Sequence, residues 1–413
     1  MVPRHITDVV LTLMQDEPVV LVQGPRSVGK TTLLLHIAEK LGAEVVDLDD
    51  LATRDAARGD PALFVGGDPP VCIDEYQHVP ELLDAIKSEL NRDGSAGRFL
   101  LTGSTRHDAL PKAAQALTGR LHVVDVLPLA QGEIDGRTEQ FVQLLLNEPN
   151  SLVTREVSTT TREEYIRRVC AGGFPLALGR SERSRSRWFD NYVKLSLERD
   201  IAELDTLRKR DKLPALLARL AGQTAQVINI NAVAQDLGLA HHTATDYTRL
   251  LEAVFLVHQL PAWGTTLTSR TAVSPKIHVV DSGLAARLLR VSLSKLAGRD
   301  ASSLQQFGRL LETFVVAECR KQLSWLDDIP LVGHWRTRDG VEVDLVIEGD
   351  DGRVAAIEVK AGSRVRGDDL TGLQQLRNKL GERFVAGAAL YTGERSYSPD
   401  DRIYVFPVDR LWS

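Results

Sequence analysis

The sequence predicts an α/β protein of several domains, with a parallel sheet first, a helical and winged-helix region next and an α+β domain last. In the first 140 residues, short apolar runs alternate with helical segments, which is typical of a parallel sheet covered on both faces. Three short helices and two apolar runs follow residue 213, and hairpin patterns follow residue 335. A chain of 413 residues is also too long for one core and suggests about two to four domains.

We expect four parts: a sheet domain over 1–140, a helical linker or lid over 141–212, a winged helix-turn-helix over 213–290 and a final domain over 291–413. The apolar share of 43% and charged share of 26% are ordinary for globular proteins. No apolar run approaches the roughly 18 residues that span a bilayer, so we expect a cytoplasmic protein and no membrane partner. The net charge of −6 argues against a nucleic-acid coat but allows a local basic groove.

A glycine-rich loop after the first apolar run carries the first functional signal. Two glycines separated by four residues are followed by Lys and Thr, and a helix begins there. Gly24 and Gly29 let successive N–H groups face one anion, and the helix dipole adds positive potential. We expect Lys30 to reach the β- and γ-phosphates of a nucleoside triphosphate and Thr31 to bind magnesium. The predicted nucleotide-binding residues are Gly24, Pro25, Arg26, Ser27, Val28, Gly29, Lys30, Thr31 and Thr32.

Two acids close the apolar run at residues 69–75. A strand that delivers Asp74 beside a phosphate-binding loop is where magnesium is held, usually through water, and the adjacent Glu75 can activate the attacking water. An apolar run that ends in acids is a weak signal alone, and the preceding loop makes it strong. We therefore predict hydrolysis as well as binding, with Lys30 and Glu75 as catalytic residues.

A third apolar run, over 98–105, ends in small polar residues. We expect its strand to lie between the two strands that end in the loop and in the acids. The hydroxyl of Ser104 or Thr102 could then sense the γ-phosphate, and ordinary turn capping is an open alternative. Arg120 precedes a further strand at 121–127 and could act as an arginine finger in its own subunit or in a neighbour's, or pair with a nearby acid.

Together these elements resemble the AAA+ family of P-loop ATPases. The adjacent Asp and Glu separate them from GTPases of the Ras type. The guanine-reading Asn-Lys-x-Asp pattern is absent, because Asn378-Lys379 continues as Leu380-Gly381. We therefore expect ATP and Mg²⁺ as cofactors. Whether the chain forms an oligomer in which Arg120 acts across subunits stays open.

The middle of the chain is helical and charged. Four arginines between residues 180 and 187 precede Trp188 and either line a nucleic-acid or nucleotide path or, as is more common, begin a solvated helix. From residue 213 the spacing predicts a winged helix-turn-helix whose turn is Gly238-Leu239. Its predicted helices cover 213–225, 232–237 and 243–253, its strands 254–260 and 276–280, and its wing 261–274.

The third of these helices would present the DNA-reading side chains if the module binds DNA. They are His241, His242, Thr243, Thr245, Tyr247 and Arg249. Only one of the six is a permanent cation, so phosphate anchoring is poor and a packing role is the alternative.

The last domain holds a second group of charged residues. Strands are predicted at 335–338, 341–348 and 353–360. The loop Asp350-Asp351-Gly352 suits a three-residue hairpin, which places Gly349 opposite Arg353 and hence Asp344 opposite Glu358. Strand alternation then predicts one core face and one polar face. The core face would hold Val341, Val343, Leu345, Ile347, Ala355, Ile357 and Val359, and the polar face Glu342, Asp344, Glu358 and Lys360.

Two carboxylates placed opposite each other repel by a few tenths to about 1 kcal/mol unless water or a cation screens them. A cation between Asp344 and Glu358 would match a metal-dependent nuclease site, in which Lys360 helps to activate water. Glu312, on a helix over 310–321, is the candidate fourth member. A solvated amphipathic hairpin is the alternative.

The Asp-(13 residues)-Glu-x-Lys spacing resembles the PD-(D/E)xK nuclease superfamily, with Val343 where that pattern has Pro. Nearly the whole chain resembles a bacterial and archaeal family of AAA+ type ATPases whose C-terminal domain of unknown function has this nuclease-like core. The similar blocks are Gly172-Gly173-Phe174-Pro175, Glu198-Arg199-Asp200-Ile201, Pro275-Lys276-Ile277 and Asp281-Ser282-Gly283-Leu284. The resemblance implies a P-loop ATPase domain, a winged helix and a restriction-endonuclease-like α+β domain, but no substrate.

Three functional hypotheses follow. In the first, a magnesium-dependent ATPase uses its ATP state to control a C-terminal module that binds nucleic acid or a protein partner. In the second, that module is an ATP-gated, metal-dependent nuclease. In the third, the protein is a regulatory switch that binds DNA or a protein partner without cleavage.

Overall fold

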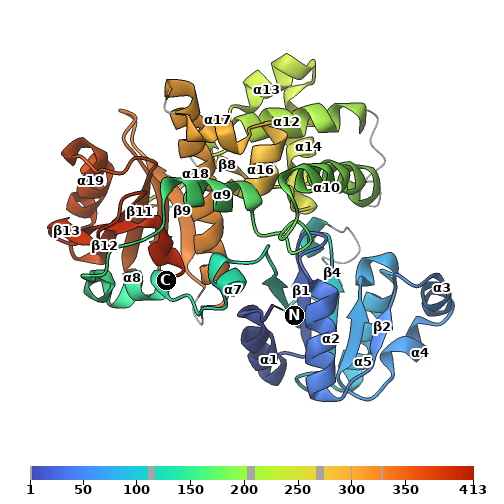
Figure 1. The fold of residues 1–413 in the computed structure, drawn as a ribbon. Coiled ribbons are helices and arrows are strands. Elements are labelled where there is room, and N and C mark those ends of the chain that lie inside the picture. Colours follow the sequence, from blue (N-terminus) through green and yellow to red (C-terminus); the bar gives the residue numbers. More distant parts are fainter. Residues whose placement is uncertain (1, 110–116, 202–209, 267–273, 299, 327–328) are drawn as a thin grey trace.

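The computed structural model describes residues 2–109, 117–201, 210–266, 274–298, 300–326 and 329–413. Figure 1 shows the N-terminal sheet domain on one side, the C-terminal sheet on the other, and helices of the middle region above and between them. None of the helices in the described ranges combines the length and the apolar character that a membrane span needs. One apolar cluster extends from Ile6 to Trp412, so the parts are packed as one body.

The N-terminal domain is a parallel sheet of five strands in the order β2-β3-β4-β1-β5. Its strands are β1 Val19–Gln23, β2 Val45–Asp47, β3 Val71–Asp74, β4 Phe99–Gly103 and β5 Leu121–Asp125. Its helices are α1 Ile6–Asp16, α2 Lys30–Leu41, α3 Leu51–Gly59, α4 Pro61–Val65 and α5 Leu82–Arg92. The first two helices cover one face and the other three cover the opposite face. The predicted doubly covered parallel sheet and the central place of β4 are confirmed.

The helical segment predicted as a linker or lid packs against the rest of the chain. Its helices are α7 Gln131–Asp135, α8 Phe141–Asn147, α9 Arg162–Ala171 and α10 Glu182–Leu195, with a π-helical turn at Ser196–Asp200. The Phe141 ring of α8 meets the Phe406 ring of the C-terminal sheet at 5.8 Å between centroids. Since apolar side chains of α9 and α10 also join the common core, this segment is not an independent unit.

The next region has three helices and an antiparallel sheet in the order β6-β8-β7, whose short strand β6 lies between the first two helices in the chain. The elements are α12 Leu213–Gly222, α13 Ile230–Leu237, α14 His241–Ala253, β6 Gln226–Val227, β7 Val257–Leu260 and β8 Lys276–Val279, then α16 Ser282–Leu288 and α17 Leu293–Ala297. The three helices and the strands β7 and β8 follow one another as predicted, with Gly238 in the left-handed conformation at the turn (φ 62°), whereas the short strand β6 between α12 and α13 was not predicted. Residues 267–273 of the expected wing lie outside the described residues. The winged-helix assignment stays a prediction.

The C-terminal domain is a mixed sheet in the order β13-β14-β12-β11-β10-β9. Its strands are β9 Leu331–Arg336, β10 Glu342–Glu348, β11 Val354–Lys360, β12 Phe384–Tyr391, β13 Tyr397–Asp400 and β14 Ile403–Pro407. The long helix α18 (Ala301–Leu323) covers one face of this sheet, and α19 (Thr371–Leu380) covers the other. An α+β domain is therefore present, and its likeness to restriction endonucleases stays a prediction.

The hairpin register of β10 and β11 is the predicted one. The Gly349 N–H donates to the Arg353 carbonyl at 2.9 Å, and Leu345 stands opposite Ile357. The prediction of a single core face is wrong, because the pairing of β10 with β9 is irregular between Val343 and Val346. Side chains before the irregularity pack on the α19 side, while Leu345 packs on the α18 side. Both faces of the strand are consequently buried.

Two of the sequence blocks that carry the family resemblance, 172–175 and 281–284, are in direct contact. Asp281 caps α16 by accepting the Leu284 N–H at 2.9 Å, and its other oxygen accepts the Gly173 N–H at 2.7 Å. A Cβ on Gly172, whose φ is +68°, would lie 2.1 Å from an Asp281 carboxylate oxygen. These blocks are thus explained by packing and need no ligand.

Candidate functional site

The phosphate-binding loop runs from the end of β1 into α2. Gly24 is required by a close approach, because a Cβ there would lie 2.1 Å from the Val126 carbonyl oxygen. Gly29 caps α2 with a left-handed φ of +96°. Lys30 is 4% exposed, and its ammonium donates to the carbonyl oxygens of Gly24 and Pro25 at 3.1 and 3.0 Å. The loop therefore keeps a cation where an anion would bind.

The other predicted loop residues surround this lysine. Ser27 has a left-handed φ of 62°, and the buried Val28 accepts a hydrogen bond from Arg4 through its carbonyl oxygen at 2.8 Å. Thr31 and Thr32 are exposed on the first turn of α2. The structure thus brings the nine predicted nucleotide-binding residues into one loop and one helical turn.

Asp74 and Glu75 lie beside the loop, at the carboxyl end of β3. Asp74 is 2% exposed and accepts hydrogen bonds from the hydroxyls of Thr102 and Thr31. Burial raises the pKa of Asp74 in spite of these bonds. Glu75 adopts a left-handed φ of 53°, held by its N–H to Thr102 Oγ1 at 3.1 Å. Its carboxylate lies 3.9 Å from Lys30 Nζ.

Electrostatics favour an ionised Glu75. Burial acts to raise its pKa, but Lys30, Gln77 and Arg26 outweigh burial, and the pKa of Glu75 lies below its usual value. Sequence reasoning missed Gln77, whose side-chain nitrogen donates to Glu75 and, at 3.1 Å, to Ser104. Its position two residues after Glu75 was the only available signal. A carboxylate held in this way can orient a water molecule and accept its proton.

The two hydroxyls predicted as phosphate sensors meet the acids, because β4 lies between β1 and β3. Thr102 binds Asp74 directly, and Ser104, which is 1% exposed, stands beside Glu75 through Gln77. A sensing role for either hydroxyl stays a prediction.

Arg120 lies at the wrong edge of the sheet for its own nucleotide site. It directly precedes β5, whose Leu121 stands opposite Val19 at the amino end of β1, whereas the loop follows Gln23 at the carboxyl end. All amino ends of parallel strands meet at one edge, so a finger within the same subunit is excluded. Arg120 donates to Asn91 Oδ1 at 2.8 Å, and its action on a neighbouring subunit stays a prediction.

Magnesium fits the donors beside the loop. The Thr31 hydroxyl and the Asp74 carboxylate touch each other, and both are oxygen ligands of the kind Mg²⁺ prefers. Lys30 and the loop N–H groups would face the phosphates of the same nucleotide.

The second predicted group also comes together, with one additional member. Lys276 of β8 is 1% exposed, and its ammonium donates to Glu312 Oε1 and Asp344 Oδ1, both at 2.8 Å. Lys360 Nζ donates to Glu358 Oε1, also at 2.8 Å. Burial lowers the pKa of Lys276, but the surrounding carboxylates outweigh burial and raise it. Burial and then Asp344 raise the pKa of Glu358 to about 8.

A metal ion at Asp344 and Glu358 is not supported by this geometry. Lys276 takes one oxygen of Asp344, and the Val359 N–H takes the other at 2.9 Å. Across the described ranges, no group of three or more His, Cys, Asp and Glu side chains is arranged to hold a metal. Sequence reasoning missed Lys276 as a member because it lies 68 residues before Asp344, in a different predicted domain. A lysine inside the apolar run of residues 276–280 was the available signal.

The helix predicted to read DNA offers little surface for it. Tyr247 is 5% exposed and belongs to the core, and Arg249 pairs with Asp246 at 3.5 Å on the same helix. Only His241 and His242 remain as other exposed members of the predicted set. DNA contact through α14 is therefore not supported.

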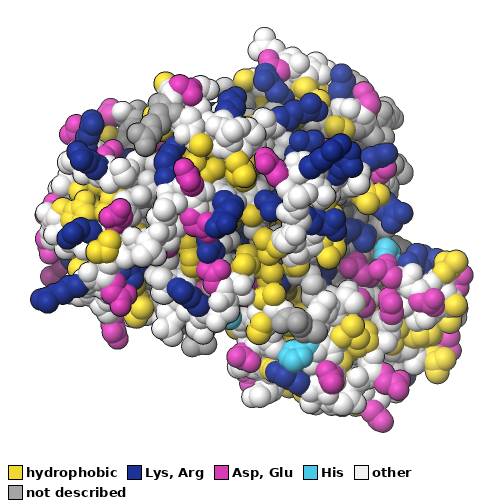
Figure 2. Space-filling model, viewed as in Figure 1, with side chains coloured by type: hydrophobic (Ala, Val, Ile, Leu, Met, Phe, Trp, Pro, Cys, Tyr) yellow, Lys and Arg dark blue, Asp and Glu magenta, His cyan; other side chains and the backbone are white. Residues whose placement is uncertain are grey.

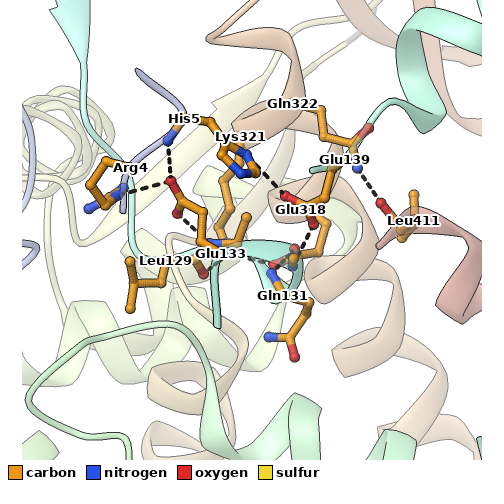
Figure 3. Close-up of polar contacts among 12 residues, drawn as sticks. Arg4, His5, Leu129, Gln131, Glu133, Glu139, Glu318, Lys321, Gln322 and Leu411 are labelled. Atoms are coloured by element: carbon orange, nitrogen blue, oxygen red, sulfur yellow. Dashed lines mark hydrogen bonds and ion pairs between the residues drawn. The ribbon is translucent and has the colours of Figure 1, made fainter. Parts of the chain in front are cut away.

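A third group of buried charges joins the N-terminus to α18 (Figure 3). Glu133 accepts from Arg4 Nε at 3.0 Å and from the His5 N–H at 2.9 Å. Glu318 accepts from Lys321 at 2.5 Å and from a backbone N–H of α7 at 2.8 Å. These carboxylates have local partners, so we interpret the group as a structural joint.

Comparisons with known families divide the chain into three blocks. Residues 16–135 match an AAA domain. Residues 162–295 match a domain of unknown function (DUF8612), and residues 307–411 match another (DUF4143). The N-terminal part is therefore similar to AAA domains, and the two later blocks match domains of unknown function.

The chain is similar to "Uncharacterized protein Rv2008c" of Mycobacterium tuberculosis and "Uncharacterized protein Mb2031c" of Mycobacterium bovis. Each is 28% identical over 403 residues, which cover 95% of this chain and 81% of the relative. Among solved structures, the Walker-type ATPase PABY2304 of Pyrococcus abyssi is 14% identical with a TM-score of 0.41, over 70% of this chain and 96% of that one. The Thermotoga maritima RuvB Holliday junction branch migration motor is 18% identical with a TM-score of 0.29, over 63% and 90%. TM-scores this low do not establish a shared fold.

Proposed function

We propose that the protein hydrolyses ATP in a magnesium-dependent reaction and uses its ATP state to control the C-terminal part of the chain. The observation that carries this proposal is the convergence of Lys30, Asp74 and Glu75 at one edge of a parallel sheet, beside an anion-binding loop. The match of residues 16–135 to an AAA domain supports it.

Each residue has a separate role in this proposal. The present partners of the Lys30 ammonium include two neutral carbonyl oxygens, which a phosphate would replace as a stronger, charged acceptor. Thr31 and Asp74 would hold Mg²⁺, which neutralises charge that develops on the phosphates. Glu75, ionised beside Lys30, would orient the attacking water and accept its proton.

ATP turnover by the full chain, with and without Mg²⁺, tests the proposal. Lys30→Ala should weaken ATP binding and lower turnover by about 10²–10³-fold. Glu75→Gln should still bind ATP but lose about 10²–10⁴-fold in turnover. Lys40→Ala, which removes an exposed lysine at the end of α2, is the matched control and should behave as wild type. Unchanged ATP binding in Lys30→Ala would refute the placement of the nucleotide.

Arg106, in the loop after β4, is our candidate for passing the ATP state on. Its backbone N–H donates to the Ala253 carbonyl at 2.9 Å, and its side-chain Nε donates to the Glu252 carbonyl at 3.3 Å, both at the end of α14. Its guanidinium lies 5.0 Å from the centre of the Phe255 ring. The next residue, His107, donates its N–H to the side chain of Gln23 at 2.8 Å, directly before the phosphate loop. A change at the nucleotide would thus have a short path to α14 and β7.

A second candidate function is nucleic-acid binding, and charge distribution favours it. Residues 162–295 contain 20 Lys and Arg against 13 Asp and Glu, although the whole chain has a net charge of −6. Figure 2 shows Lys and Arg side chains gathered over the helical region, while Asp and Glu are frequent on the sheet domain. Arg183 and Arg187 are exposed one turn apart on α10, without an ion pair to any described residue. This spacing suits consecutive phosphates better than α14 does.

Fluorescence anisotropy with short DNA and RNA, single- and double-stranded, tests this second function over a salt series. The double variant Arg183→Glu, Arg187→Glu should bind more than about tenfold more weakly at low salt and lower the salt slope by about two. The control reverses two exposed arginines of the last domain, Arg338→Glu and Arg364→Glu. Equal losses in both variants would argue against a site on α10, and no binding at low salt would leave only a protein partner.

A further inference from the structure

The charged cluster of Lys276, Glu312, Asp344, Glu358 and Lys360 contains residues from two of the three segments that match known families. Lys276 lies on β8, within residues 162–295, whereas the carboxylates lie on α18, β10 and β11, within residues 307–411. The cluster is therefore a contact between two domains as well as a group of acids.

The ammonium of Lys276 has the surroundings of a bound cation. It lies 2.8 Å from both Glu312 Oε1 and Asp344 Oδ1 and 3.9 Å from Glu342 Oε1, and Lys276 is 1% exposed. Mg²⁺ requires oxygen ligands at about 2.0–2.1 Å in octahedral geometry. A metal could not share these two oxygens with the ammonium, because the two cations would overlap and repel.

Glu358 supplies a second, independent observation. The residue is 8% exposed, its Oε1 accepts from Lys360, and its Oε2 is buried without a hydrogen-bond partner among the described residues. Asp344 and Glu312 both interact electrostatically with this carboxyl group. A buried carboxylate oxygen without a donor, in a cluster of acids, could bind a cation that took the place of the Lys276 ammonium.

We propose that Lys276 is the resident cation of this cluster and that its ammonium group excludes a divalent metal from the nuclease-like site. The acids then join β8 to the last domain. Nuclease chemistry there would require Lys276 to withdraw, since its present position leaves Asp344 no oxygen for a metal.

Mn²⁺ binding to the nucleotide-free full chain, followed by the electron paramagnetic resonance signal of free Mn²⁺, tests the proposal. Wild type and Asp344→Asn should bind the same amount of Mn²⁺, because no wild-type site uses Asp344. Lys276→Ala should gain one Mn²⁺ site at least about tenfold tighter than any in wild type, and the added Asp344→Asn change should abolish it. Lys360→Ala is the matched control, because it removes the neighbouring lysine, whose side chain is 26% exposed, and should gain no site.

Mn²⁺ binding by wild type that Asp344→Asn removes would overturn the proposal, as would a folded Lys276→Ala that gains no site. If Lys276→Ala does not fold, wild type is compared with Glu358→Gln, which keeps the Lys276 contacts. Wild-type binding lost in that variant would equally overturn the proposal, and absence of binding in both would support it. Because no nucleotide is present, these outcomes are independent of ATP hydrolysis.

Discussion

Two buried lysines near carboxylates are held in opposite ways in this protein. Lys30 and Lys276 are 4% and 1% exposed. Lys30 donates to two neutral carbonyl oxygens at 3.0–3.1 Å, with the Glu75 carboxylate 3.9 Å away. Lys276 donates to two carboxylates, both at 2.8 Å. The two lysines therefore differ more in the charge of their hydrogen-bond acceptors than in how deeply they are buried.

This difference decides which lysine can serve a ligand. An ammonium held by neutral carbonyls can turn to a phosphate, because the charged acceptor binds it more strongly. An ammonium between two buried carboxylates leaves them uncompensated when it moves, and uncompensated buried charge is costly. The first arrangement suits an exchangeable anion site, and the second suits a permanent joint between domains.

The largest expected effect is on stability. Lys276→Met should lower the free energy of unfolding of the C-terminal part by about 3–5 kcal/mol, because it breaks a buried ion pair from one side. Lys30→Met should cost less than this, because its ion pair with Glu75 is longer, at 3.9 Å, and its hydrogen bonds go to neutral acceptors, worth about 1 kcal/mol each. Urea unfolding followed by tryptophan fluorescence measures both. Equal losses in the two variants would remove the distinction between the sites.

The phosphate site could be predicted because its signals are local. The phosphate-binding loop begins directly after β1 and leads into Lys30, and the pair Asp74-Glu75 closes β3, so the carboxyl edge of a parallel sheet had to bring them together. The register of β10 and β11, in which Leu345 stands opposite Ile357, was equally predictable, since a short hairpin loop determines it.

The remaining features depend on relations that a single sequence does not reveal. The contact of Lys276 with Asp344 joins residues 68 positions apart through the packing of two domains. The strand irregularity after Val343 follows from the partner strand β9 and changes which side chains share a face. Arg120 is different: a residue that precedes a parallel strand lies at the amino edge, so its distance from the loop could have been inferred.

The pH dependence of stability should also separate the two sites, by a smaller change at each pH unit. Burial raises the pKa of Glu358 to about 8 from 4.5, so the folded state holds this proton more tightly than the unfolded state. Stability from this group is complete below about pH 4.5 and is lost as the pH rises toward 8, by up to about 1.4 kcal/mol per pH unit. Glu358→Gln should flatten that decline in urea midpoints. Glu75, whose pKa is lowered, should show the opposite sign, with stability lost as the pH falls.

The smallest expected effect concerns communication between the two lysine sites. Arg106→Ala should leave the affinity for a non-hydrolysable ATP analogue within about threefold, because Arg106 contacts α14 rather than the loop. It should nevertheless remove the change in amide hydrogen exchange of β7 and β8 that the analogue produces in wild type, a coupling of about 1 kcal/mol. Arg120→Ala, at the opposite edge of the same sheet, is the matched control and should retain the change. If exchange in β8 responds to nucleotide equally in both variants, the ATP state reaches Lys276 by a route that does not include the Arg106 side chain.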